Sequence, residues 1–202
     1  MKDGRLLLLV VPTFYLSICL INVADNALEY WAALVYGFVL TGLFTVSTVF
    51  HTVAAFSSNR LWRNIFHRMD RAMIYIFIAG SYTPWLHLKS LSGISSELRW
   101  AVWVLATLGI LYQQIFHEMY KALETFFYVV IALLPSLAVF EMDDSGGLFE
   151  LKVGGVIYMT GVVFFKCDGV VPLAHAIWHV HVVFGALIHY YAVSAYLIVE
   201  EV

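Results

Sequence analysis

Charged residues are scarce in this 202-residue chain. Asp, Glu, Lys and Arg make up 12% of it, against 62% hydrophobic residues, and the mean hydropathy is +0.85. In a soluble domain about a quarter of the residues are charged, so this composition excludes a soluble globular domain. With 11 basic and 14 acidic residues the net charge is −3, and we expect no nucleic acid among the partners. The chain is predicted to be an integral membrane protein.

Cysteines, repeats and long linkers are also few or lacking. The two cysteines, Cys19 in an apolar run and Cys167 in a short loop, are poor partners for a disulfide. No clear small-residue cleavage site follows the charged start, so the first apolar run is expected to stay as a helix. Residues 1–202 are predicted to form a single domain, because no low-complexity tract or long linker divides them.

Long apolar runs are what the sequence does contain. A helix needs about 20 mostly apolar residues to cross the hydrocarbon core, and seven runs approach that length. They are Leu6–Ala24, Tyr30–Phe56, Arg71–Leu88, Leu98–Phe116, Leu123–Phe140, Lys152–Phe165 and His175–Val199. The sixth is the shortest, since three glycines dilute it. The predicted fold class is all-α, a polytopic membrane protein with a bundle of seven transmembrane helices.

Basic residues divide unequally between the two sides of this topology. The side of the N-terminus carries eight of them, and the opposite side carries three, Lys89, Arg99 and Lys152. Positive charge favours the cytoplasmic side, so the N-terminus is predicted to be cytosolic and the C-terminus luminal or extracellular. The acidic residues of the 25–29 and 141–144 loops, and Glu200 and Glu201, then fall on the outer face.

Three histidines stand out within the apolar runs. His175 and His179 lie one helical turn apart at the start of the last run, and His51 follows Ser47 by one turn in the second. In the predicted topology His51, Asp70, His175 and His179 share a similar depth near the cytosolic leaflet. Two imidazoles from one helix and a third from another match a three-histidine zinc site with an open fourth position.

Simpler interpretations stand beside this one. A single intramembrane histidine is more often a hydrogen-bonding group between helices than a metal ligand, and serine hydroxyls such as that of Ser47 routinely bond to backbone carbonyls. Asp70 could be solvated or paired with an arginine. His189 is expected in the bundle interior, because fourteen residues place it about 21 Å along the helix from His175.

The remaining histidines are less informative. His181 points to another side of the last helix, and histidine at a membrane boundary is unremarkable. His117 with Glu118 offers a second site at the inner face, for which packing is the preferred explanation. The boundary histidines are His67, His87 and His117.

The segments STVFH (47–51), Asp70 and HAIWH (175–179) resemble the progestin and adipoQ receptor family, which includes hemolysin III-like proteins and is similar to alkaline ceramidases. The likeness runs from about Leu7 to the C-terminal helix. It implies a seven-helix bundle with a cytosolic N-terminus and Zn²⁺ on His51, His175 and His179, with Asp70 and Ser47 at the metal-bound water as catalytic candidates. Family members usually carry a Glu and an Asn in a cytosolic segment ahead of the first helix, so we expect a shortened N-terminus.

Three functions from different classes stay open. The first is a receptor or scaffold acting in signalling at Golgi or late endosome and lysosome membranes, rather than the plasma membrane, with the 60–71 loop contacting anionic lipids or a cytosolic partner. The second is a zinc-dependent hydrolase of ceramide-like lipid amides, in which Asp70 moves the proton and Ser47 stabilises the oxyanion. A small pore or transporter is disfavoured, because the polar residues cluster at one depth instead of forming a path across the membrane. We prefer the first.

Overall fold

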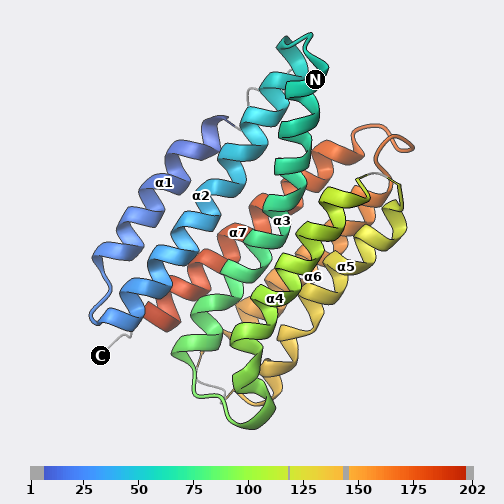
Figure 1. The fold of residues 1–202 in the computed structure, drawn as a ribbon. Coiled ribbons are helices and arrows are strands. Elements are labelled where there is room, and N and C mark those ends of the chain that lie inside the picture. Colours follow the sequence, from blue (N-terminus) through green and yellow to red (C-terminus); the bar gives the residue numbers. More distant parts are fainter. Residues whose placement is uncertain (1–6, 118, 143–145, 199–202) are drawn as a thin grey trace. The chain divides into compact units, whose positions relative to one another are not determined.

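The computed structural model describes residues 7–117, 119–142 and 146–198, and the elements along them are helical. Seven α-helices follow one another in this part of the chain (Figure 1). They are α1 (Leu7–Asn22), α2 (Ala27–Phe56), α3 (Arg60–Leu88), α4 (Gly93–Ile115), α5 (Lys121–Leu133), α6 (Leu148–Lys166) and α7 (Ala174–Val193). A 3₁₀ helix, η1 (Pro135–Phe140), follows α5, and a π-helix, η2 (Ser194–Ile198), follows α7. The predicted all-α class is confirmed.

The helices group into two compact units. The first unit, residues 1–141, contains α1 to α5 and η1, and the second, residues 142–202, contains α6, α7 and η2. The single domain over residues 1–202 stays a prediction.

Helix α2 is the longest helix of the first unit and carries two of the predicted site residues. It begins where the Asn26 side chain accepts hydrogen bonds from the backbone amides of Leu28 and Glu29, both at 3.0 Å. An N-cap of this kind satisfies amides that have no partner in the first turn. From Tyr30 to Phe56 no acidic or basic side chain other than His51 interrupts the apolar sequence, so the helix continues for 30 residues.

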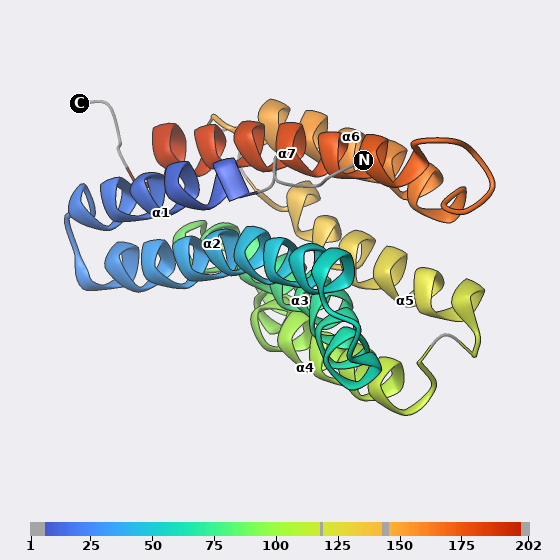
Figure 2. The ribbon, with the colours of Figure 1, turned by 90° about the horizontal axis from the view of Figure 1, so that it is seen from above.

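Close packing fixes α2 between α1 and α3, as Figures 1 and 2 show. A Cβ atom added to Gly37 would lie 2.7 Å from Ser17 Cβ, and the Ser17 hydroxyl lies 3.0 Å from the Gly37 carbonyl oxygen. On the other side, a Cβ atom on Gly80 would lie 2.6 Å from Val39. Small residues at such contacts let membrane helices approach closely.

The second unit is built on the pair α6 and α7, which lie side by side in Figure 2. Gly161 of α6 faces His181 and Trp178 of α7, and a Cβ atom there would come within 2.8 Å of His181 Cβ. Gly185 of α7 faces Tyr158 of α6, and a Cβ atom added to Gly185 would lie 2.7 Å from the Tyr158 ring. Gly161, one of the three glycines that dilute the sixth apolar run, therefore marks a helix contact. Helix α6 is longer than its predicted span.

The third helix begins earlier than predicted. Residues 60–71, expected to be a basic loop, form the first three turns of α3, with Asn59 capping the helix by accepting from Leu61 N at 2.9 Å. The charges of this stretch end the hydropathy signal without ending the helix, because arginine is a good helix former. The prediction of a loop at Arg60–Arg71 is wrong. Arg60, Arg63 and Trp62 are exposed on this helical extension.

Four segments of the described residues are long and apolar enough to cross a membrane: Ala27–Phe56, Ala122–Phe140, Leu148–Lys166 and Ala174–Ile198. Residues Leu8–Asn22 form a shorter apolar helix. Helices α3 and α4 fall outside this set, because arginine, glutamine and aromatic residues lower their hydropathy. The four long apolar segments support the prediction of a polytopic membrane protein.

The orientation of the termini stays a prediction. Several charges used in it lie outside the described residues, and so does Glu118, predicted to accompany His117. The charged residues concerned are Lys2, Arg5, Asp143, Asp144, Glu200 and Glu201.

Candidate metal centre

His175 and His179 form a convergent pair at the start of α7. Their Nε2 atoms lie 3.0 Å apart, and the ring centroids are 4.6 Å apart with the rings nearly perpendicular. Both side chains are half-buried. Two ring nitrogens aimed at one point can share a proton as a hydrogen bond or serve as two ligands of one metal ion. The predicted pairing of these histidines on one helix face is confirmed.

Asp168 contacts this pair from the loop between α6 and α7. Its Oδ2 atom lies 3.0 Å from His175 Nδ1. An ionised carboxylate only accepts hydrogen bonds, so the Nδ1–H of His175 donates. Sequence reasoning missed Asp168; the available signal was an acidic residue seven positions before a candidate ligand.

The other candidates belong to the first unit. Ser47 and His51 lie one turn apart on α2, and Asp70 lies eleven residues into α3. His51 and Asp70 are half-buried, whereas Ser47 is only 5% exposed. Within the part of the chain that the structure describes, the buried Ser47 Oγ has no hydrogen-bond partner. The expected bond to a backbone carbonyl is therefore not made, although Thr45 makes one to Thr41 O at 2.8 Å.

Two of the histidines predicted at the membrane boundary, His67 and His117, make packing and hydrogen-bond contacts with neighbouring side chains. The His67 ring stacks on Phe50 with centroids 5.0 Å apart, and its Nε2 accepts from Arg71 Nε at 3.2 Å. His117 Nδ1 lies 3.1 Å from Gln113 Nε2. These contacts favour the packing interpretation for the boundary histidines.

His189 and His181 lie where the sequence places them. His189 is 5% exposed, which agrees with its expected interior position. His181 lies against α6, with its ring centroid 5.2 Å from that of Phe164. Neither adds a ligand to the pair on α7.

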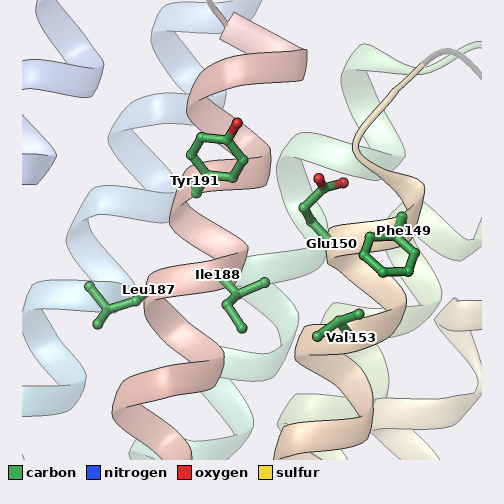
Figure 3. A pocket seen from close by; sticks show the side chains of 6 residues that line it. All are labelled: Phe149, Glu150, Val153, Leu187, Ile188 and Tyr191. Carbon is green, nitrogen blue, oxygen red and sulfur yellow. The ribbon is translucent and has the colours of Figure 1, made fainter.

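A groove of about 360 Å³ lies elsewhere in the second unit (Figure 3). Its α7 residue nearest to the pair, Leu187, follows His179 by eight positions, about 12 Å along a helix axis. The groove is separate from the histidines, and its lining is mostly apolar, as expected of a surface in contact with lipid. The lining residues are Phe149, Glu150 and Val153 of α6, and Leu187, Ile188 and Tyr191 of α7.

The helices and the histidine pair define a polytopic membrane protein with a candidate metal centre. The model of the haemolysin-III related family matches residues 4–190, so the chain belongs to that family. It is 46% identical to the monocyte to macrophage differentiation factor of Homo sapiens over 190 residues, covering 94% of this chain and 80% of that protein.

More distant relatives share the same region. The Hemolysin-3 homolog of Bacillus subtilis (strain 168) is 30% identical over 195 residues, covering 95% of this chain and 89% of that protein. The progestin and adipoQ receptor-like protein 1 of Caenorhabditis elegans is 23% identical over 213 residues, covering 91% and 48%. No solved structure matches the chain significantly. The resemblance stated from the sequence is confirmed.

Proposed function

We propose that His51, His175 and His179 bind a zinc ion. The observation that carries this is the 3.0 Å separation of the Nε2 atoms of His175 and His179. Zinc bonds to histidine nitrogen at about 2.0–2.1 Å, so two ligands of a tetrahedral site lie roughly 3.3 Å apart. The pair is already near that spacing, and His51 supplies the third nitrogen. Three protein ligands leave a fourth position open.

Ser47 supports the same proposal from the first unit. A buried hydroxyl without a partner is unfavourable by about 1–3 kcal/mol, and the Ser47 Oγ is such a group among the described residues. Because Ser47 lies one turn before His51, an oxygen held at a metal centre beside His51 would give this hydroxyl a partner. The chemistry of the three histidines and the unsatisfied hydroxyl therefore fit zinc.

The function we infer is that of a zinc-binding membrane protein acting in signalling at endomembranes, as a receptor or scaffold. Relatives named as a differentiation factor and as a receptor-like protein support a signalling role. In this role zinc joins α2 to α7. We propose Golgi or late endosome and lysosome membranes as the location.

The exposed start of α3 is the proposed contact for anionic lipids or a cytosolic partner. Arg60 and Arg63 are exposed there, and Trp62 beside them has 51% of its surface exposed. Arginine binds phosphate and carboxylate groups through two parallel hydrogen bonds, and tryptophan favours the membrane interface. These side chains fit a boundary between the membrane and the cytosol.

The second candidate is a zinc-dependent lipid amide hydrolase, which the unsatisfied Ser47 hydroxyl specifically favours. A zinc ion in such a site supplies Lewis-acid polarisation of the acyl oxygen and an acidified water. Asp70 accepts a proton from the attacking water and passes it to the leaving nitrogen as the C–N bond breaks. The Ser47 O–H donates to the developing oxyanion. A ceramide-like lipid would place its acyl chain among the apolar helices.

One lipid screen separates the two candidates. Zinc-loaded protein in vesicles is incubated with a panel of ceramides, and free fatty acid is measured. A hydrolase releases fatty acid in the wild type and not in Asp70→Asn, while both proteins keep their zinc. If the wild type releases none under any lipid condition while still binding zinc, the receptor or scaffold role is retained and the hydrolase is rejected.

A further inference from the structure

The loop of residues 167–173 has a tightly specified backbone. The amides of Val170 and Val171 both donate to the Cys167 carbonyl oxygen, at 3.0 and 2.9 Å. Two residues are in the left-handed region, Gly169 with φ 80° and Leu173 with φ 64°. Glycine adopts this conformation readily, whereas leucine does so at an energetic cost. Strained backbone persists where the surroundings hold it, and it is common at functional sites.

This backbone holds the Asp168 carboxylate beside the Nδ1 atom of His175. The 3.0 Å contact from His175 Nδ1 to Asp168 Oδ2 places the proton on Nδ1. In a neutral imidazole with Nδ1 protonated, Nε2 carries the lone pair that binds a metal. That same Nε2 is the atom that faces His179 Nε2 at 3.0 Å. Asp168 therefore contacts one ring nitrogen of His175, Nδ1, and His179 contacts the other, Nε2.

Folding stability alone does not account for this contact. The side chains of His175 and Asp168 are 36% and 50% exposed, and exposed ion pairs contribute little to stability. What the contact does fix is the rotation of the ring and the position of its proton. Metal-binding histidines usually donate their second N–H to a carboxylate or carbonyl for this purpose.

We propose that Asp168 is a positioning residue for the zinc ligand His175, holding its Nδ1 proton and directing its Nε2 lone pair to the metal. This inference rests on the proposed zinc site. It adds a residue from the loop between α6 and α7 that does not itself touch the metal. The two residues belong to the same unit of the structure.

Zinc affinity of the purified full-length protein tests this role. Asp168→Asn and Asp168→Ala are compared with the wild type by competition against a chromophoric zinc chelator. Loss of such a carboxylate typically weakens metal binding about 10–100-fold, and we expect both variants to fall in that range. Asp168→Glu, which can still accept from Nδ1, should recover part of the affinity. Asp25→Asn makes the same chemical change at an exposed loop of the first unit and should bind zinc like the wild type.

A second readout separates positioning from general damage. Cobalt(II) replaces zinc in such sites and its visible absorption bands report ligand geometry; these bands should shift in Asp168→Asn while the helix content of the metal-free protein stays that of the wild type. Equal zinc affinity and equal cobalt spectra in wild type and both variants would overturn the inference and leave the zinc site intact. A wild type that binds neither metal would instead reject the proposed function itself, and the inference with it.

Discussion

Arg71 of α3 and Glu124 of α5 form a buried ion pair, with Arg71 Nη1 2.7 Å from Glu124 Oε2 and only 4% of the glutamate side chain exposed. The other carboxylate oxygen, Oε1, accepts from the Tyr128 hydroxyl at 3.1 Å. His67 accepts from the same arginine through Nε2. The pair therefore anchors a polar network between α3 and α5.

Glu124→Gln should destabilise the first unit strongly. Removing one member of a buried ion pair leaves the other charge uncompensated, at a cost of about 3–5 kcal/mol. The midpoint of thermal unfolding in detergent should drop accordingly. Glu97→Gln, at an exposed position on α4, is the matched control and should change stability by no more than about 0.5 kcal/mol. Equal midpoints for the two variants would mean that the ion pair is not formed.

Gly161→Ala should weaken the contact of α6 with α7. A Cβ atom at this position would lie 2.8 Å from His181 Cβ and 3.0 Å from the Trp178 ring, and overpacking of this kind costs about 1–3 kcal/mol. Gly155→Ala on the same helix meets nothing within 4 Å, and better helix propensity should make it neutral or more stable by up to about 1 kcal/mol. The free energies of unfolding of both variants are measured by reversible unfolding in mixed detergent. A Gly161→Ala protein as stable as Gly155→Ala would contradict the packing of the two helices.

Ser47 and Thr48 offer a matched pair of buried hydroxyls. Neither Ser47 Oγ nor Thr48 Oγ1 has a hydrogen-bond partner among the described residues, so removing either should raise stability by about 1 kcal/mol in metal-free protein. Thr48 lies three residues before His51, about 60° from it around the axis of α2, whereas Ser47 lies about 40° from it; only Ser47 is a proposed neighbour of the metal. With zinc bound, only Thr48→Val should keep its gain, since Ser47→Ala loses a partner at the metal centre.

The free energy of unfolding, measured with zinc and with a chelator, decides this point. The same gain for Ser47→Ala under both conditions would separate Ser47 from the metal site. A gain for Thr48→Val that vanished with zinc would show that the comparison reports a general effect of the metal on α2.

Hydropathy predicts the helices well because length and apolar composition decide what can cross a bilayer. It predicts the start of the third helix at Arg71, eleven residues late, since charge lowers hydropathy without ending a helix. The histidine pair follows from a spacing of four on one helix. Glu124 and Asp168 could not be found this way. Glu124 pairs with Arg71, which is 53 residues away in the sequence. Asp168 is positioned by a loop in which the backbone of Leu173 is left-handed, a conformation that the sequence does not predict.

Zinc content of the full-length protein and its histidine variants is the most direct test of the central claim. Purified wild type should contain about one zinc per chain, as a single three-histidine site requires. His51→Ala should lower that content as sharply as His175→Ala and His179→Ala do, because all three are proposed ligands. His87→Ala is the control, since His87 Nδ1 bonds to the Thr83 carbonyl oxygen at 2.9 Å within α3. A folded wild type without zinc, or a His51→Ala protein that keeps its full zinc content, would contradict the account.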